Sequence, residues 1–228
     1  MFEAEAEGLA ELASSRKIRV PEVIGSGSAA SQAFLVIEAI DLCGSGDSSA
    51  LGKQLADLHR VEAPEFGWRR DNHIGATPQK NGWDRNWGRF FAEQRLGFQF
   101  QLAEKRGTTF RGAEQLLERI PDLIGAHEPR PSLLHGDLWG GNAAFDESDE
   151  PVIFDPAVYY GDREAELAFT EMFGGFSADF YTAYEGSWPL PDGAEDRKPI
   201  YNLYHVLNHF NLFGGGYARQ AQTIIDRF

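Results

Sequence analysis

Apolar side chains recur at helical spacing over much of the chain, and this pattern predicts a structure rich in α-helices. The segment 49–59 is the clearest case, because Leu51, Leu55 and Leu58 fall on one face. The same reasoning predicts further helices at residues 3–14, 84–105, 112–120, 163–173 and 199–213.

Shorter apolar runs predict a few β-strands. Residues 33–38 are the strongest candidate, and the runs 143–145 and 151–154 flank the polar turn 146–150, which indicates a hairpin. Pro121 should end the helix that precedes it, because proline lacks the N–H donor that a helix interior needs. The combination of many helices and few strands predicts an α+β fold.

A polar loop before the hairpin carries the candidate chemistry. The spacing of Asp137, Asn142 and Asp155 is the layout of a kinase-type phosphoryl-transfer site. In such sites the first Asp accepts the proton of the attacking hydroxyl, and the Asn and the second Asp hold the Mg²⁺ ions that accompany ATP. Taken singly, Asn142 or Asp155 would more often be a turn former. Both residues at kinase spacing from a His-Gly-Asp favour a catalytic site.

Composition and charge disfavour several classes of partner. The formal net charge of -14 argues against nucleic acids and anionic membranes, which attract an excess of Lys and Arg. No apolar stretch is long enough to span a bilayer, no secretory-type start is evident, and the single Cys43 has no partner for an internal disulfide. We therefore expect a cytoplasmic protein.

Longer sequence strings resemble the fructosamine kinases, also called ketosamine kinases, over essentially the whole chain. The most particular of them are His135-Gly136-Asp137-Leu138-Trp139, Phe154-Asp155-Pro156-Ala157, Tyr160-Gly161-Asp162-Arg163-Glu164, Met172-Phe173-Gly174-Gly175-Phe176 and Leu207-Asn208-His209-Phe210-Asn211. The resemblance implies a protein-kinase-like fold. Residues 1–40 would be a remnant of the N-terminal lobe and its sheet, and residues 41–228 the mostly helical C-terminal catalytic lobe.

The resemblance also locates the nucleotide and a missing part. Family members begin with a glycine-rich loop and a strand lysine, whereas this chain starts at what looks like the next helix, so roughly fifty residues would be absent and activity impaired. In that helix Glu5 is the candidate partner of the lysine, although a solvated Glu fits the acidic run equally well. Backbone groups near Glu38 and Ile40, at the end of the predicted strand, would meet the adenine edge.

Three tryptophans are candidates for contact with a sugar-like substrate, because an indole ring can stack on a polyol chain. The resemblance favours this role for Trp139, for which the residues alone leave a core role equally open. Trp83 and Trp87 lie in a segment dense in aromatic and amide groups. Trp87 also shares helical spacing with Phe90 and Phe91, which indicates a buried helix face, and we expect those two phenylalanines in the core.

Other polar residues near the motif are better read as structural supports. His135 should brace the backbone of the catalytic loop. Asp162 and Glu166 should cap and brace the lobe that follows. His59 and Arg60 should be charge partners of a helix C-terminus.

The resemblance implies transfer of the ATP γ-phosphate to a sugar hydroxyl of a ketosamine, carried by a small amine or by a glycated protein, as a deglycation step. Two alternatives stay open: a catalytically inactive binding protein, and a small-molecule kinase of the aminoglycoside or choline type. Phe34 and Val36 would lack sheet partners, and such an apolar edge favours self-association into a homo-oligomer.

Overall fold

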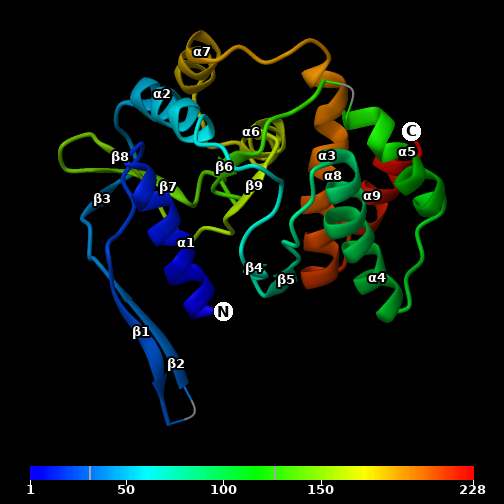
Figure 1. Cartoon of the computed structure of the whole chain (residues 1–228), viewed down its shortest axis with the longest axis horizontal. Coiled ribbons are helices and arrows are strands. Elements are labelled where there is room, and N and C mark those ends of the chain that lie inside the picture. The colour runs from blue at the N-terminus through cyan, green and yellow to red at the C-terminus, as the bar shows by residue number, and fades with distance from the viewer. Residues whose placement is uncertain (31, 126) are drawn as a thin grey trace.

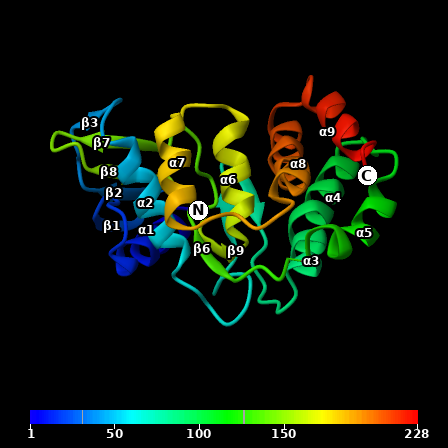
Figure 2. The same ribbon diagram turned by 90° about the horizontal axis from the view of Figure 1, so that it is seen from above.

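The computed structural model describes residues 1–30, 32–125 and 127–228, in which helices pack around four small antiparallel sheets. The helix α1 and a long β1–β2 hairpin lie at one side, and the hairpin projects away from the helical body (Figure 1). Seen from above, α7, α6 and α8 follow one another across that body (Figure 2). The fold is therefore α+β, as the sequence predicts.

The element bounds are as follows. The helices are α1 (Phe2–Ser15), α2 (Ser48–His59), α3 (Trp87–Phe90), the π-helix η1 (Phe91–Gly97), α4 (Phe98–Lys105), α5 (Ala113–Gly125), α6 (Arg163–Met172), α7 (Ala178–Ser187), α8 (Ala194–Phe213) and α9 (Tyr217–Ile225). The strands are β1 (Val23–Ala29), β2 (Gln32–Ile37), β3 (Leu42–Cys43), β4 (Asn72–Ile74), β5 (Thr77–Gln79), β6 (Ser132–Leu134), β7 (Ala143–Asp146), β8 (Pro151–Ile153) and β9 (Tyr159–Gly161).

Each predicted helix is present, but the ends of some differ from the prediction. Helix α5 does not end at Pro121; it continues to Gly125. Leu116, Ile120 and Ile124 form one buried face of this helix. Packing of that face outweighs the hydrogen bond that the proline cannot make. Helix α8 likewise begins before its proline, at residue 194 rather than 199, and the short helices α7 and α9 were not predicted.

The long helix predicted for 84–105 begins at Trp87. The backbone N–H of Asp84 donates to the Phe66 carbonyl, and the Asp84 carbonyl accepts from the Phe66 N–H. These two bonds hold Asp84 outside the helix. The Asn86 side chain then accepts from the Arg89 N–H at 2.8 Å and acts as the N-cap. A helical pattern alone does not reveal where such a cap will form.

A π-helical turn interrupts the same helix and places a charged residue in the core. Arg95 lies in η1, is 0 % exposed, and its guanidinium lies 4.0 Å from the centre of the Tyr159 ring. It also donates to the Asn81 side-chain oxygen at 2.9 Å. A buried guanidinium is tolerated where rings and acceptors replace water, and π-turns of this kind are frequent near functional sites.

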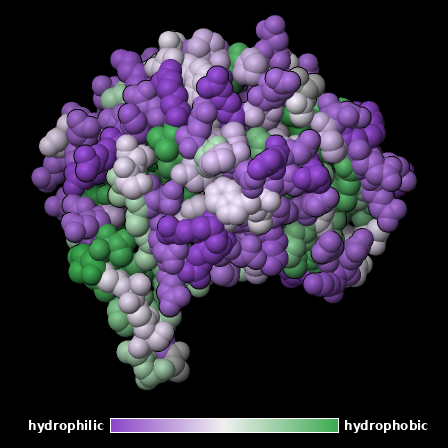
Figure 3. Space-filling model, viewed as in Figure 1, coloured by the Kyte–Doolittle hydropathy of each residue, from purple (hydrophilic) through white to green (hydrophobic). Residues whose placement is uncertain are grey.

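The predicted hairpin at residues 143–154 is confirmed as β7–β8, with Ala143 paired to Ile153. The predicted strand near 33–38 is confirmed as β2, which pairs with β1. Ile24, Phe34 and Val36 on that hairpin are 68 %, 44 % and 44 % exposed, and Figure 3 shows hydrophobic surface over it. The expectation that Phe34 and Val36 lack sheet partners is wrong, because they pair with Gly27 and Gly25 of β1, although both side chains are exposed.

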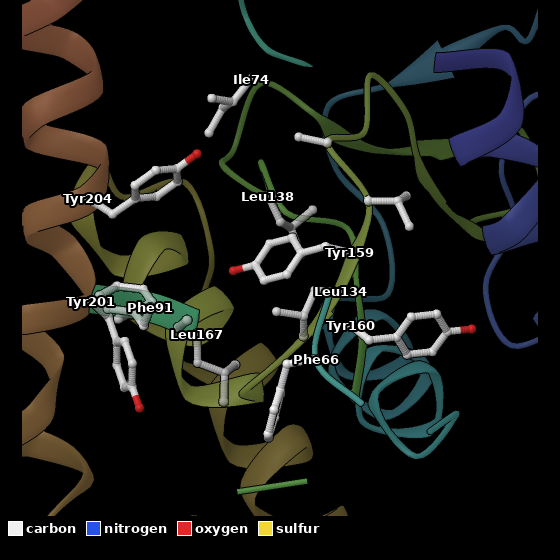
Figure 4. Close-up of a cluster of buried hydrophobic side chains, with 14 of the residues drawn as sticks. Phe66, Ile74, Phe91, Leu134, Leu138, Tyr159, Tyr160, Leu167, Tyr201 and Tyr204 are labelled. Carbon is white, nitrogen blue, oxygen red and sulfur yellow. The ribbon is translucent and has the colours of Figure 1, made fainter. Parts of the chain in front are cut away.

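The core lies directly under the candidate catalytic loop. Leu134 and Leu138 flank its first residues, are fully buried, and pack in a cluster with Phe91, Tyr159 and Tyr201 (Figure 4). Apolar burial on both sides of the loop fixes its backbone. Within the part of the chain that the structure describes, none of the helices combines the length and the apolar character needed to cross a membrane.

Candidate active site

Two polypeptide segments meet to form the candidate site. The loop 135–142 follows β6, and residues 154–157 follow β8. The Ala157 N–H donates to the His135 carbonyl at 2.8 Å, and the Phe154 N–H donates to the Asn142 carbonyl at 3.1 Å. These bonds connect the two segments at both ends, and the structure thereby places Asp137 and Asp155 on the wall of one cavity.

A buried carboxylate supports the loop from below. Glu166 of α6 accepts from the Gly136 N–H at 2.6 Å, the His135 N–H at 3.2 Å and the His59 ring at 2.9 Å. Burial alone would raise the pKa of Glu166, but the His59 hydrogen bond and charge outweigh it and hold the pKa below its usual range. Glu166 therefore has the predicted bracing role. His59, expected only as a helix-end charge partner, belongs to the same network.

His135 also braces the backbone, as predicted. Its Nδ1 accepts from the Asp137 N–H at 3.3 Å, so its Nε2 carries the proton and donates to the Phe154 carbonyl at 2.9 Å. Complete burial lowers the pKa of His135 and keeps the ring neutral. Asp162, the other predicted support, accepts from the Glu164 N–H and caps α6.

Asp137 is the most strongly perturbed acid of the site. Burial raises its pKa to about 7, and the charges of Asp155 and Glu166 add to the effect. A carboxyl that titrates near neutral pH is matched to general-base catalysis. Asp137 lines two cavities.

Asn142 and Asp155 have the donor chemistry that Mg²⁺ prefers. The Asn142 amide nitrogen donates to the Asp137 carbonyl at 2.9 Å and the Asp155 carbonyl at 3.4 Å, which leaves the amide oxygen as the free ligand atom. Asp155 has a backbone φ of +59°, uncommon for a residue with a side chain. Such strain is typical of functional positions. The predicted metal role of the two residues stays a prediction.

Glu5 of α1 lies close to the same carboxylates. Burial raises the pKa of Glu5, and the charge of Asp155 raises it further. Among the described residues, no lysine or arginine lines the two cavities that contain both acids. The pair therefore forms an anionic pocket that a cation would stabilise.

Three cavities share lining residues. The first, of about 240 Å³, is lined by Glu38, Ile40 and Asp155 among others. Glu5 and Asp155 also line the second, of about 340 Å³, which reaches Asp137. Asp137 in turn lines the third, of about 320 Å³. Shared lining residues therefore connect the predicted adenine contacts near Glu38 and Ile40 with the acidic residues Glu5, Asp155 and Asp137.

The tryptophans divide between cavity and core. Trp139 is 42 % exposed and lines the third cavity beside Asp137. Trp87 is 2 % exposed and donates to the Tyr201 hydroxyl at 3.2 Å, so its predicted substrate contact is wrong. It is a core residue, with Phe90 and Phe91, which confirms the expectation for those two rings.

Trp83 is exposed but stands apart from the chemistry. Its ring lies 6.2 Å from that of Tyr160, whose hydroxyl donates to Glu11, and it lines neither cavity that contains Asp137. Sequence reasoning missed the actual cavity residues, which come from β4, α6 and α8: Asn72, His73, Phe173, Asn208, His209 and Phe213. For some of them, the only signal in the sequence was that they lie in the segments that resemble the fructosamine kinases.

This fold and this site define a kinase-type, ATP-dependent phosphotransferase. A sequence model of the fructosamine kinase family matches residues 1–228, and the chain belongs to that family. A probable ketoamine kinase of Synechocystis sp. is 49 % identical over 231 residues, covering 100 % of this chain and 78 % of that protein. The chloroplastic protein-ribulosamine 3-kinase of Oryza sativa subsp. japonica is 42 % identical over 100 % of this chain and 68 % of its own length.

Solved structures of other proteins have a similar fold. A putative fructosamine-3-kinase from Haemophilus somnus has a TM-score of 0.94 at 33 % identity, covering 100 % of this chain and 79 % of that one. A macrolide 2'-phosphotransferase from Brachybacterium faecium has a TM-score of 0.51 at 18 % identity, covering 98 % of this chain and 79 % of its own, and shares the fold alone. The predicted family and enzyme class are thus confirmed.

Replacing Gly136 by alanine should disrupt the loop. Gly136 has a φ of +84°, and an added Cβ would lie 2.1 Å from the Ala157 carbonyl oxygen. Gly107 is a matched control, with a φ of +82° and nothing within 4 Å of its Cβ position. We expect Gly107→Ala to cost about 1 kcal/mol and Gly136→Ala at least about 2 kcal/mol more. Urea unfolding measures both, and equal costs would contradict the steric argument.

Replacing Asp137 by asparagine should stabilise the fold in a pH-dependent way. Because the folded-state pKa of Asp137 is raised to about 7, the wild type loses stability as pH rises from about 4 through 7. The variant has no such titration, and its advantage should reach up to about 4 kcal/mol above pH 7, at about 1.4 kcal/mol per pKa unit. Urea midpoints without metal at pH 5 and pH 8 test this. The same gap at both pH values would contradict it.

Proposed function

We propose that this protein transfers the γ-phosphoryl group of ATP to a sugar hydroxyl of a ketosamine. The observation that carries the proposal is the position of Asp137, which lines both the anionic cavity next to Asp155 and the aromatic cavity next to Trp139. A proton acceptor between a phosphate site and an acceptor site is what a hydroxyl kinase requires. The printed names of the relatives support a ketoamine or ribulosamine acceptor.

The adenine end of ATP would bind at the first cavity. The Glu38 side chain is held by Arg19, and the Glu38 N–H donates to the Glu22 carbonyl. Within the described residues, the Glu38 carbonyl and the Ile40 N–H have no hydrogen-bond partner. An acceptor and a donor two residues apart are suited to the edge of an adenine ring.

The phosphates would then lie beside the acidic pocket. Asn142 and Asp155 would hold Mg²⁺, which when bound neutralises charge on the phosphates. Asp137 accepts the proton of the acceptor hydroxyl, and the hydroxyl oxygen forms the new bond to the γ-phosphorus. The bond from that phosphorus to the bridging oxygen breaks, and ADP leaves.

The acceptor site supports a ketosamine over an aminoglycoside. The third cavity is lined by aromatic and aliphatic side chains, and Asp137 is the one carboxylate among its described lining residues. A polycationic acceptor would need several carboxylates. A panel of ketosamines, aminoglycosides and choline-like alcohols tests the assignment, and phosphorylation of the aminoglycosides or choline-like alcohols but not of the ketosamines would overturn it.

Asp137→Asn should lower the rate of phosphoryl transfer about 10²–10⁴-fold and leave Mg–nucleotide affinity unchanged. The reason is that Asp137 takes the proton and the metal ligands are other residues. Asp155→Asn is the contrasting variant and should weaken Mg-dependent nucleotide binding. Radiolabel transfer and calorimetric binding give the two readouts. Full transfer by the Asp137 variant would disprove its role as the base.

The 228-residue chain itself should be a weak kinase. No lysine or arginine among the described residues lines the cavities around Glu5 and Asp155, so no cationic side chain there aligns the phosphates. Phosphoryl transfer depends on alignment and electrostatic stabilisation, and we expect a rate far below the roughly one per second of ordinary kinases. A steady-state assay with ATP and a ketosamine measures it, and an ordinary rate would show that this cation is dispensable.

A further inference from the structure

The acceptor cavity has an aromatic rim that proton transfer to Asp137 does not use. The rim consists of Trp139, Phe173, His209 and Phe213, all of which line the third cavity. Phe173 is 45 % exposed and Phe213 is 70 % exposed. Exposed aromatic side chains gathered at one cavity indicate a binding role rather than a core role.

The rim is continuous across two helices. Phe173 caps the end of α6, and its ring lies 5.1 Å from that of His209 on α8. The His209 ring lies 5.7 Å from that of Phe213, one helical turn further on. His209 Nδ1 donates to the His205 carbonyl at 2.7 Å, which fixes the orientation of its ring. Trp139 reaches the same cavity from the catalytic loop.

The position of the rim decides which part of the acceptor meets it. The hydroxyl that is phosphorylated must contact Asp137 at the floor of the cavity. The rest of the acceptor then extends toward the exposed rings. In a ketosamine, the group beyond the sugar is an amine, which is protonated near neutral pH.

We infer that the aromatic rim binds the protonated amine of the acceptor through cation–π contacts. This inference rests on the proposed ketosamine function. Aromatic rings attract a cation through the negative charge of their faces, and such cages recognise alkylammonium groups. Asp137 is the one carboxylate among the described lining residues and is engaged with the hydroxyl. The rings are therefore the groups that hold the positive charge.

A pair of ligands with the same shape isolates the charge. 1-Deoxy-1-piperidino-fructose carries the ammonium group, and 1-deoxy-1-cyclohexyl-fructose replaces its nitrogen by carbon. Calorimetric binding to the 228-residue chain requires no turnover. We expect the charged ligand to bind roughly 5–30-fold more tightly.

Variants of Phe213 separate cation–π binding from simple apolar contact. Phe213→Leu keeps an apolar side chain but has no aromatic face, and it should reduce the preference for the charged ligand several-fold. Phe34→Leu changes another exposed phenylalanine, which lies outside the cavity, and it should leave the preference intact. Neither residue belongs to the phosphoryl-transfer machinery.

The outcomes are distinct. Equal binding of the two ligands, or a preference that survives in Phe213→Leu, overturns the cation–π inference but not the ketosamine assignment. If neither sugar binds, the assignment of the cavity to ketosamines fails, and the inference fails with it.

Discussion

The buried carboxylate of Glu166 is the interaction on which the site depends. It accepts hydrogen bonds from two consecutive backbone N–H groups, of His135 and Gly136, and from the His59 ring. An isolated buried carboxylate would be costly, but three donors compensate it. Tyr184 in turn contacts the other His59 nitrogen at 2.7 Å. Helices α2, α6 and α7 are thereby joined beneath the loop, so that packing of the helical body fixes the direction of Asp137.

The site above this network is electrostatically unfavourable without a cation. Glu5 and Asp137 both have a raised pKa, first because they are buried and then because Asp155 is nearby. Like charges in a partly desolvated cleft oppose folding. The same charges favour binding of a divalent cation with its nucleotide. Part of the stability of the free protein is thus lost to a cleft that is suited to metal and phosphate.

Features that depend on residues close together in the sequence could be predicted. The spacing of Asp137, Asn142 and Asp155 within one loop and one hairpin was sufficient to place them together, because the connection between them is short. The existence of the other helices was also predictable from apolar spacing, whereas the short helices α7 and α9 were missed. Trp87 was misassigned because an aromatic residue at helical spacing has the same pattern whether it faces the core or a ligand. The difference arises from tertiary packing against Phe66 and Tyr201.

The acceptor cavity was beyond prediction for a related reason. Its wall combines Trp139 with Phe173 of α6 and Phe213 of α8, and no local pattern joins positions so far apart. Asp137, Asn142 and Asp155 lie in one compact segment, 135–155, whereas most of the lining of the third cavity comes from α6, α8 and the residues next to them. Helix α6 links the two parts, because it carries Glu166, which accepts from the loop N–H groups, and Phe169, which lines the third cavity.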